Sequence, residues 1–345
     1  MKGIKTIIVL SAIALLAFAS AKEYAISYPK HFPAPQYNFK NNPFKKASIA
    51  LGRALFYDPI LSKDNSISCA SCHSPYNAFT HTDHQLSHGI NDQIGTRNAP
   101  ALFNLAWQNS FMWDGAINHI EVQALAPMSH PKEMAETIEH VVEKLKDKAL
   151  YKRFFVDAYR DSVITGERLL KALAQFQLSL ISANAKYDQV KNGQNSFTVQ
   201  EQNGYQLFLK NCNSCHREPL FSTYAFANNG LIVDATLNDI GKGAISHKPE
   251  DSLLFKIPSL RNLSYSPPYM HDGRFHSLNQ VIKHYTSIDT TKKVSENLKQ
   301  KIMLNAHEQI DIIAFLLTLN DSSFVSNPNY VFPKILLPQS EGNKK

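Results

Sequence analysis

Apolar residues recur every three to four positions in three stretches of the chain, and this spacing predicts three amphipathic helices. The stretches run from Met134 to Leu145, from Leu169 to Leu180 and from Ile310 to Leu317. Asn305 and Glu308 precede the third stretch with the spacing of a capping box, which marks a helix start. Strand-like alternation is scarce. The pattern therefore predicts a mainly α-helical fold.

The first residues have the features of an export signal. Lys2 and Lys5 form a basic start, and Thr6–Ala19 is an almost wholly apolar run that is short for a membrane span. Ala19-Ser20-Ala21 then supplies a small-x-small cleavage site. We expect a signal peptide over residues 1–21, cleaved after Ala21, and a periplasmic protein without a membrane anchor; an uncleaved anchor is the alternative.

Polar segments divide the rest of the chain. The segment Lys191–Ser196 interrupts the helical pattern and predicts a domain boundary. The expected units are an N-terminal domain over residues 22–192 and a C-terminal domain over residues 193–326. Residues 327–345 contain several prolines and are expected to form an irregular surface tail.

Composition narrows the class of protein further. The chain has 345 residues with 43% hydrophobic and 10% aromatic content, which excludes an intrinsically disordered protein. The formal charge is +7, and without residues 1–21 it falls to +5 because that segment holds two lysines and no acids. The chain has no run of five or six like charges, so we expect no nucleic-acid partner.

The cysteines indicate the cofactor. All four fall in two C-x-x-C-H motifs, which are Cys69, Cys72 and His73, and Cys212, Cys215 and His216. Disulfides or a zinc site are alternatives for an exported protein, but neither explains why a histidine follows directly in both cases. Covalent c-type haem attachment does explain it, with the histidine as proximal iron ligand. We therefore expect two haem c groups.

The two motifs lie in a weak internal repeat. The pattern G-x-x-L-F precedes both, at Gly52–Phe56 and at Gly204–Phe208, and a phenylalanine follows each, Phe79 and Phe221. This repeat predicts two cytochrome c-like haem domains in tandem.

Two haems alone do not distinguish an enzyme from an electron carrier. A carrier fills both axial positions of each iron, whereas an enzyme leaves one position open for substrate. A carrier here would need a permanent second ligand such as His88, which follows the first motif in a loop with His81 and His84.

Further motifs carry a resemblance that favours an enzyme. From about Pro43 to Asn320 the chain resembles the bacterial di-haem cytochrome c peroxidase family, which includes the MauG-type enzymes that oxidise protein residues. The motifs are Arg97–Pro100, Phe111–Gly115, Glu121–Pro127, His130–Met134, Pro258–Asn262 and Pro268–Gly273.

The resemblance implies roles for individual residues. Trp113 matches the tryptophan between the two haems, and Gln123 and Glu133 match the polar pair over the open face of the N-terminal haem. A carboxylate near the iron can move a proton between the two oxygens of peroxide. Because Glu133 follows Pro131, we expect it at a helix start, where the helix dipole favours its ionised form.

The resemblance also implies a calcium site between the domains. Asn98, with the backbone carbonyls of Ser266 and Pro268, matches its ligands, and oxygen donors suit a hard cation. In some members a histidine in the loop after the first motif caps the N-terminal haem in the resting state. His88 is nearest to that position.

The second axial ligand of the C-terminal haem has two candidates. Met270 has the spacing of a carrier's thioether ligand, but the family's ligand comes later, where this chain has Tyr285. The resemblance matches Tyr285 to the MauG-type tyrosinate, and a phenolate would lower the potential of the iron.

Taken together, these features predict a periplasmic di-haem peroxidase. We expect it to reduce hydrogen peroxide with electrons from a small donor, either a c-type cytochrome or a cupredoxin, and a homodimer is an expected assembly. One alternative is a MauG-like oxidase of a protein or peptide substrate. A lesser alternative is a non-catalytic di-haem electron carrier.

Overall fold

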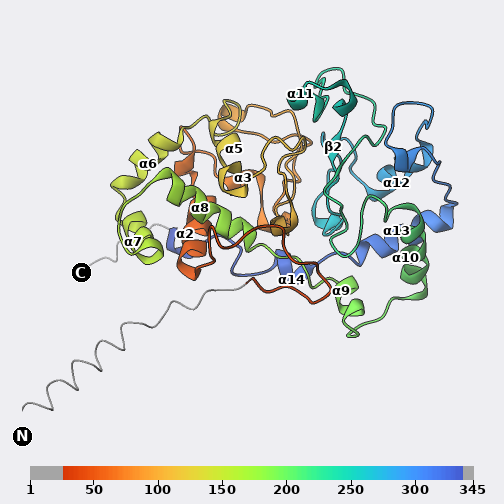
Figure 1. The fold of residues 1–345 in the computed structure, drawn as a ribbon, viewed down its shortest axis with the longest axis horizontal. Coiled ribbons are helices and arrows are strands. Elements are labelled where there is room, and N and C mark those ends of the chain that lie inside the picture. The colour runs from red at the N-terminus through yellow and green to blue at the C-terminus, as the bar shows by residue number, and fades with distance from the viewer. Residues whose placement is uncertain (1–25, 337–345) are drawn as a thin grey trace, which may run out of the picture.

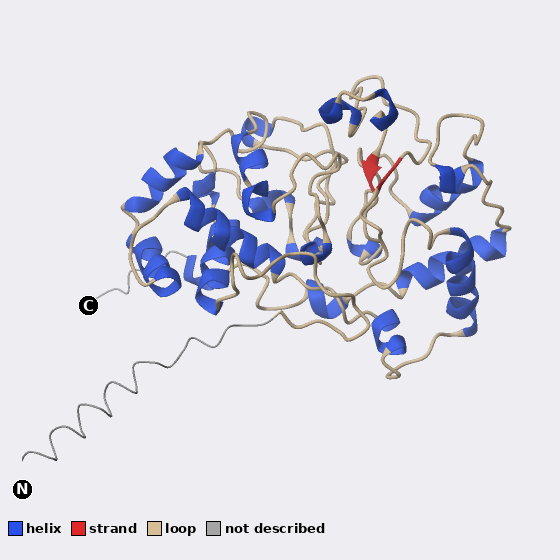
Figure 2. Cartoon of the chain, viewed as in Figure 1, coloured by secondary structure: helices blue, strands red, loops and turns tan. Residues whose placement is uncertain are grey.

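The fold was examined in a computed structural model, which describes residues 26–336. The expected signal peptide and residues 337–345 of the tail lie outside this range. Two mainly helical lobes stand side by side, and long irregular segments fill the region where they face each other (Figures 1 and 2). Within the described range, no helix has both the length and the apolar character that crossing a bilayer requires.

The elements follow the chain through the N-terminal lobe and then the C-terminal lobe (Figure 1). The N-terminal lobe contains α2 (Lys46–Tyr57), α3 (Cys69–Cys72), α4 (Ile120–Gln123), α5 (Leu125–Ser129), α6 (Ile138–Lys146), α7 (Ala149–Tyr159) and α8 (Gly166–Leu178). The C-terminal lobe contains α9 (Lys186–Lys191), α10 (Val199–Asn211), β1 (Phe226–Ala227), α11 (Gly243–Ser246), β2 (Phe255–Lys256), α12 (Leu278–Ser287) and α13 (Ala306–Leu317). The short helix α14 (Ser322–Val325) returns to the N-terminal lobe, where Phe324 joins its core. The strands β1 and β2 pair antiparallel.

The same helix packing occurs once in each lobe. Helix α2 crosses α8 and helix α10 crosses α13, and in both pairs a glycine lies at the contact. A Cβ atom on Gly52 would lie 1.9 Å from the carbonyl oxygen of Ala172, and one on Gly204 would lie 1.9 Å from that of Asp311. These are the glycines of the G-x-x-L-F repeat, so the repeat marks the same helix crossing in both lobes, as expected for two domains of one type in tandem.

The predicted helices form, with one correction. Helices α6, α8 and α13 confirm the three apolar stretches, and Asn305 and Glu308 form the capping box. The predicted buried face of α13 is wrong, because Ile310 is 54% and Leu317 is 45% exposed. The core side chains of this helix are Ile312, Phe315 and Leu316. Helix α13 is apolar on most of its sides, so periodicity alone does not select its buried face.

The C-terminal tail packs on the lobe where the chain begins. Arg53 on α2 donates hydrogen bonds to the carbonyl oxygens of Pro328 and Val331, at 2.9 and 2.8 Å. The Tyr57 hydroxyl donates to the carbonyl oxygen of Tyr330 at 2.6 Å. The tail is therefore a strap across α2 and is mostly irregular.

Candidate active site

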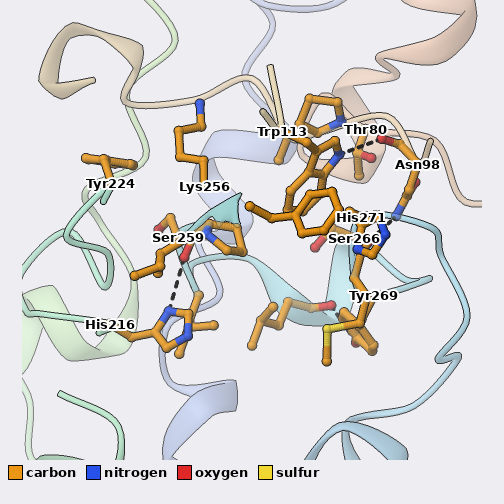
Figure 3. Close-up of a pocket in the computed structure, with 18 of the residues that line it drawn as sticks. Thr80, Asn98, Trp113, His216, Tyr224, Lys256, Ser259, Ser266, Tyr269 and His271 are labelled. Atoms are coloured by element: carbon orange, nitrogen blue, oxygen red, sulfur yellow. Dashed lines mark hydrogen bonds between the residues drawn. The ribbon is translucent and has the colours of Figure 1, made fainter. Parts of the chain in front are cut away.

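A cavity of about 620 Å³ lies between the lobes, and residues of both lobes line it. Its wall is largely apolar. His73 and Glu133 line it from the N-terminal lobe, and His216 and Tyr285 line it from the C-terminal lobe. Trp113 also lines it, from the loop that precedes α4 in the N-terminal lobe (Figure 3). One cavity therefore connects the two C-x-x-C-H motifs.

The two motif histidines are held in the same way. The Nδ1 atom of His73 donates to the carbonyl oxygen of Phe79 at 2.8 Å. That of His216 donates to the carbonyl oxygens of Pro258 at 3.1 Å and Phe221 at 3.3 Å. Both phenylalanines have positive φ angles, which turn these carbonyls toward the rings.

These contacts make His73 and His216 suitable as haem ligands. Because Nδ1 donates to a carbonyl, Nε2 carries the lone pair that an iron ligand needs. Burial lowers the pKa of both imidazoles to about 4, which keeps them neutral. The four cysteines are free thiols, and burial raises the pKa of Cys69 and of Cys212 to about 12. The donor set and the apolar wall suit two covalently held haem groups.

Trp113 contacts both lobes through hydrogen bonds. Its indole Nε1 donates to the carbonyl oxygen of Asn98 at 2.8 Å (Figure 3). Its own carbonyl oxygen accepts from the backbone N–H of Lys256 at 2.7 Å. These two bonds hold Trp113 at the wall of the cavity, and its place between two haems stays a prediction.

Two of the three predicted calcium ligands, Asn98 and the Pro268 carbonyl, come together, and Ser266 lines the same cavity. The Asn98 Nδ2 atom donates to the carbonyl oxygen of Pro268 at 2.6 Å, and the Asn98 backbone N–H donates to that of His271 at 2.8 Å. The Asn98 Oδ1 atom is buried without a partner in the described part of the chain. Rotating this amide by half a turn would bring Oδ1 beside the Pro268 carbonyl, and two such oxygens suit a cation.

Glu133 lies in a turn, not at a helix start. The turn connects α5 to α6, and α6 begins only at Ile138, so the expected help from a helix dipole is wrong. Burial raises the pKa of Glu133, while the neighbouring His130 lowers it less. The glutamate therefore holds its proton more strongly than an exposed one does.

A glycine brings the loop of the first motif close to this turn. A Cβ atom on Gly89 would lie 2.5 Å from the Cα atom of Glu133, and the N–H of Ile90 donates to the Glu133 carbonyl at 2.8 Å. Burial raises the pKa of the Cys72 thiol to about 11, and the charge of Glu133 adds to the effect. Gln123 ends α4 and lines the same cavity, with its Nε2 atom 3.7 Å from the sulfur of Met112.

The three loop histidines stack on one another. The ring centroids of His81 and His84 are 5.3 Å apart, and those of His84 and His88 are 4.2 Å apart. The His88 carbonyl oxygen accepts from the Cys72 thiol at 3.4 Å. His88 is therefore beside the first motif, with its ring against His84, and its role as a haem cap stays a prediction.

Both candidate ligands of the second iron line the cavity. The Asn229 Nδ2 atom donates to the Met270 sulfur at 3.4 Å, and the Asn229 side chain also bonds to Tyr285. Burial raises the pKa of Tyr285 to about 12, and the nearby Cys215 and Cys212 thiols add to the effect. Tyr285 thus lies beside the second motif, and its phenol is protonated unless a cation is bound.

Sequence reasoning missed several of the polar residues around this cavity. Asn229 and Tyr224 come from segments with no recognisable motif. For Lys256 the sequence offers one signal, its position two residues before the Pro258–Asn262 motif. In the structure it lines the cavity beside Trp113.

Comparisons with known proteins agree with this geometry. Residues 46–196 match the di-haem cytochrome c peroxidase family, and residues 201–320 match the cytochrome c family. The methylamine utilization protein MauG of Methylorubrum extorquens is 35% identical over 304 residues, which cover 84% of this chain and 82% of that protein. The cytochrome c peroxidase of Escherichia coli is 32% identical over 317 residues, which cover 87% of this chain and 65% of that protein.

A solved structure gives the same result. The crystal structure of a MauG-like protein associated with microbial copper homeostasis has a TM-score of 0.79 and is 29% identical, and the match covers 90% of this chain and 99% of that one. The paired haem c motifs, the shared cavity and these relatives lead to one conclusion. The chain belongs to the di-haem cytochrome c peroxidase and MauG family of oxidoreductases.

Proposed function

We propose that this protein is a periplasmic peroxidase that reduces hydrogen peroxide to water with electrons from a small redox protein, such as a c-type cytochrome or a cupredoxin. The observation that carries the proposal is the shared cavity, because residues of both motifs line it together with Glu133, Gln123 and Trp113. Peroxidase relatives at about 30% identity support the same reaction.

Bound haem would supply the iron at which peroxide is reduced, with His73 and His216 as the ligands that this chain provides. Glu133 would take a proton from the near oxygen of peroxide and return it to the leaving oxygen. A carboxyl group whose pKa is raised is suited to this exchange, because it gains and loses its proton closer to neutral pH. The Gln123 amide would orient the peroxide by donating a hydrogen bond.

Trp113 would connect the two halves of the site. Its indole lies between them and is held by hydrogen bonds at both its side chain and its backbone. An aromatic ring in this position shortens the distance that electrons cross between the cofactors. Tyr285 would bind the second iron as a phenolate, with Met270 as the alternative ligand.

The test is steady-state peroxide reduction by the purified holoprotein with a reduced small c-type cytochrome as donor. We expect oxidation of two cytochromes for each peroxide, and a spectrum with one high-spin haem. A spectrum that is low-spin in every redox state, with no peroxide turnover, would identify an electron carrier and overturn the proposal.

A MauG-like oxidase of a protein or peptide substrate is the second candidate. It is favoured by Tyr285 and by the relatives named MauG at 35% and 33% identity. Stoichiometric peroxide added without a donor separates the two functions. If the peroxide-oxidised spectrum persists and then decays on adding the target protein, the oxidase is favoured. If the spectrum returns rapidly to that of the resting protein when cytochrome alone is added, the peroxidase is favoured.

We also propose a calcium ion held by Asn98 and the carbonyls of Ser266 and Pro268. The unpartnered Asn98 Oδ1 atom supports this site. Export with cleavage after Ala21 and assembly as a homodimer stay proposals of the same kind. Intact mass of the mature protein and its elution from a sizing column test them.

A further inference from the structure

Lys256 lies where the two lobes meet. It ends β2 in the C-terminal lobe, and its backbone N–H donates to the Trp113 carbonyl at 2.7 Å. Its side chain crosses to the N-terminal lobe, where Nζ donates to Gln108 Oε1 at 2.7 Å and to the carbonyl oxygen of Ser110 at 2.9 Å. Lys256 also lines the cavity, and its side chain lies between Tyr224 and Trp113 in Figure 3.

Among the described residues, Lys256 differs from the other lysine and arginine side chains that line this cavity. Arg97 binds Asp239 through two hydrogen bonds of 2.6 and 2.8 Å. Arg261 binds Asp188 through two of 2.8 Å. Lys256 forms no ion pair with any carboxylate in the described part of the chain.

An ammonium group in this position lacks an anion. Its two acceptors are neutral oxygens, and an ammonium has three N–H donors, so one donor is left over. Burial lowers the pKa of Lys256 to about 7, which the charge of Asp114 offsets only in part. Asp114 itself is bound to Arg97. A carboxylate in the cavity would restore the charged form of Lys256.

Tyr224 supplies a second unpartnered group on the neighbouring segment. The N–H of Ile257 donates to the carbonyl oxygen of Ala225 at 2.8 Å, so the segments that carry Lys256 and Tyr224 run side by side. The Tyr224 ring is buried in the core of the N-terminal lobe, and its hydroxyl has no hydrogen-bond partner in the described part of the chain. Tyr224 also lines the cavity.

We propose that the Lys256 ammonium and the Tyr224 hydroxyl bind a propionate carboxylate of one haem at the boundary between the lobes. The inference rests on the haem occupancy in the proposed function. Each haem brings two carboxylates into a largely apolar cavity, and a buried carboxylate needs a cation or hydrogen-bond donors. By binding the propionate, Lys256 acts as a positioning residue for the cofactor. Its positive charge also raises the midpoint potential of that haem, because the reduced iron carries one positive charge less than the oxidised iron.

The test uses the holoprotein with two haems attached, as shown by intact mass, and follows both haems in a spectroscopic redox titration at several pH values. In Lys256→Gln, the midpoint potential of one haem should fall. The propionate without its cation should have a higher pKa, so the pH dependence of that potential should extend to a higher pH. Lys256→Arg should restore both properties. The matched control is Lys242→Gln, whose lysine is already paired with Asp251 at 2.9 Å and should change neither.

Unchanged potentials and unchanged pH dependence in Lys256→Gln, with both haems attached, would overturn the inference. If that variant does not accumulate with haem, Tyr224→Phe takes its place, and the resonance Raman propionate bending band should shift. An unchanged band would overturn the inference just as firmly. A potential shift in a protein without peroxide turnover would leave this inference standing and remove the proposed function, so the two failures are distinguishable.

Discussion

At the residue scale, Glu133 combines a polar group with a largely apolar setting. Its raised pKa results from burial, and no lysine or arginine pairs with it in the described part of the chain. The peroxide step needs the ionised form, which disappears as the pH falls through that raised pKa. We therefore expect the acid limb of the kcat/KM profile to lie above the ordinary glutamate pKa of about 4.3.

Substituting the carboxyl group tests this role. Glu133→Gln should keep both haems and slow peroxide turnover by about 10²-fold or more, the usual scale for lost acid–base help. The acid limb should disappear as well. The control is Glu139→Gln, an exposed position on α6. Unchanged turnover in Glu133→Gln would make Glu133 a structural turn residue.

The ligand of the second iron is also decided by single residues. If Tyr285 is the ligand, Tyr285→Phe should change the low-spin signals in the EPR spectrum of the oxidised protein, and Met270→Leu should leave them alone. The reverse result would assign Met270 and remove the residue that supports a MauG-like function. Because the pKa of Tyr285 is about 12 in the protein alone, binding as phenolate must release a proton, which a pH electrode detects on reconstitution.

At the scale of elements, the two helix crossings depend on their glycines. Gly204→Ala would place a methyl group 1.9 Å from the backbone oxygen of Asp311, which cannot rotate away. We expect overpacking to cost about 1–3 kcal/mol, against about 1 kcal/mol of helix propensity gained from alanine. The unfolding midpoint in denaturant should fall. Asn203→Ala, an exposed change on the same helix, should hold or raise it.

The sequence predicted these elements unevenly, for physical reasons. Amphipathic periodicity located α6 and α8, because one face of each helix is polar. Helix α13 is apolar nearly all round, so its buried face depends on where α10 packs against it. Glu133 was assigned to a helix start from Pro131, but Ala135 has a positive φ angle and the chain continues as a turn. Local signals do not predict such tertiary choices.

The site shows the same division between local and distant information. The haem-binding residues lie within five positions of one another in each motif, so spacing alone identified them. Lys256 on β2 meets Tyr224 and Asn229, which flank β1, at the cavity, and no motif spacing connects them. Such residues are found only when the fold brings them together.

At the scale of the whole molecule, an ion pair joins the two lobes. Arg97 comes from the N-terminal lobe and Asp239 from the C-terminal lobe, and both side chains are largely buried. Burial alone would raise the pKa of Asp239, but the hydrogen bonds from Arg97 outweigh it and lower the pKa. The stabilisation is therefore complete above the unfolded pKa of about 3.9 and is lost as the pH falls through the lower folded value.

Removing the charge of Asp239 should weaken the contact between the lobes. Asp239→Asn leaves Arg97 with Asp114 alone, and we expect a loss of about 1–3 kcal/mol, below that of a fully buried pair. Calorimetry should record a lower unfolding temperature at neutral pH and a smaller difference from wild type near pH 3. The exposed Glu250→Gln is the control. Equal unfolding temperatures for all three proteins would show that the Arg97–Asp239 ion pair does not contribute to the stability of the fold.

The strap over α2 has a consequence for how the protein is made. Synthesis proceeds from the N-terminus, yet Phe324 and Tyr330 complete the packing around α2 and follow the elements of the C-terminal lobe in the sequence. The lobe that begins first therefore closes last, after the whole C-terminal lobe has been produced. We therefore expect the first C-x-x-C-H motif to stay accessible during that interval, so that haem can be joined to Cys69 and Cys72 before the lobe closes.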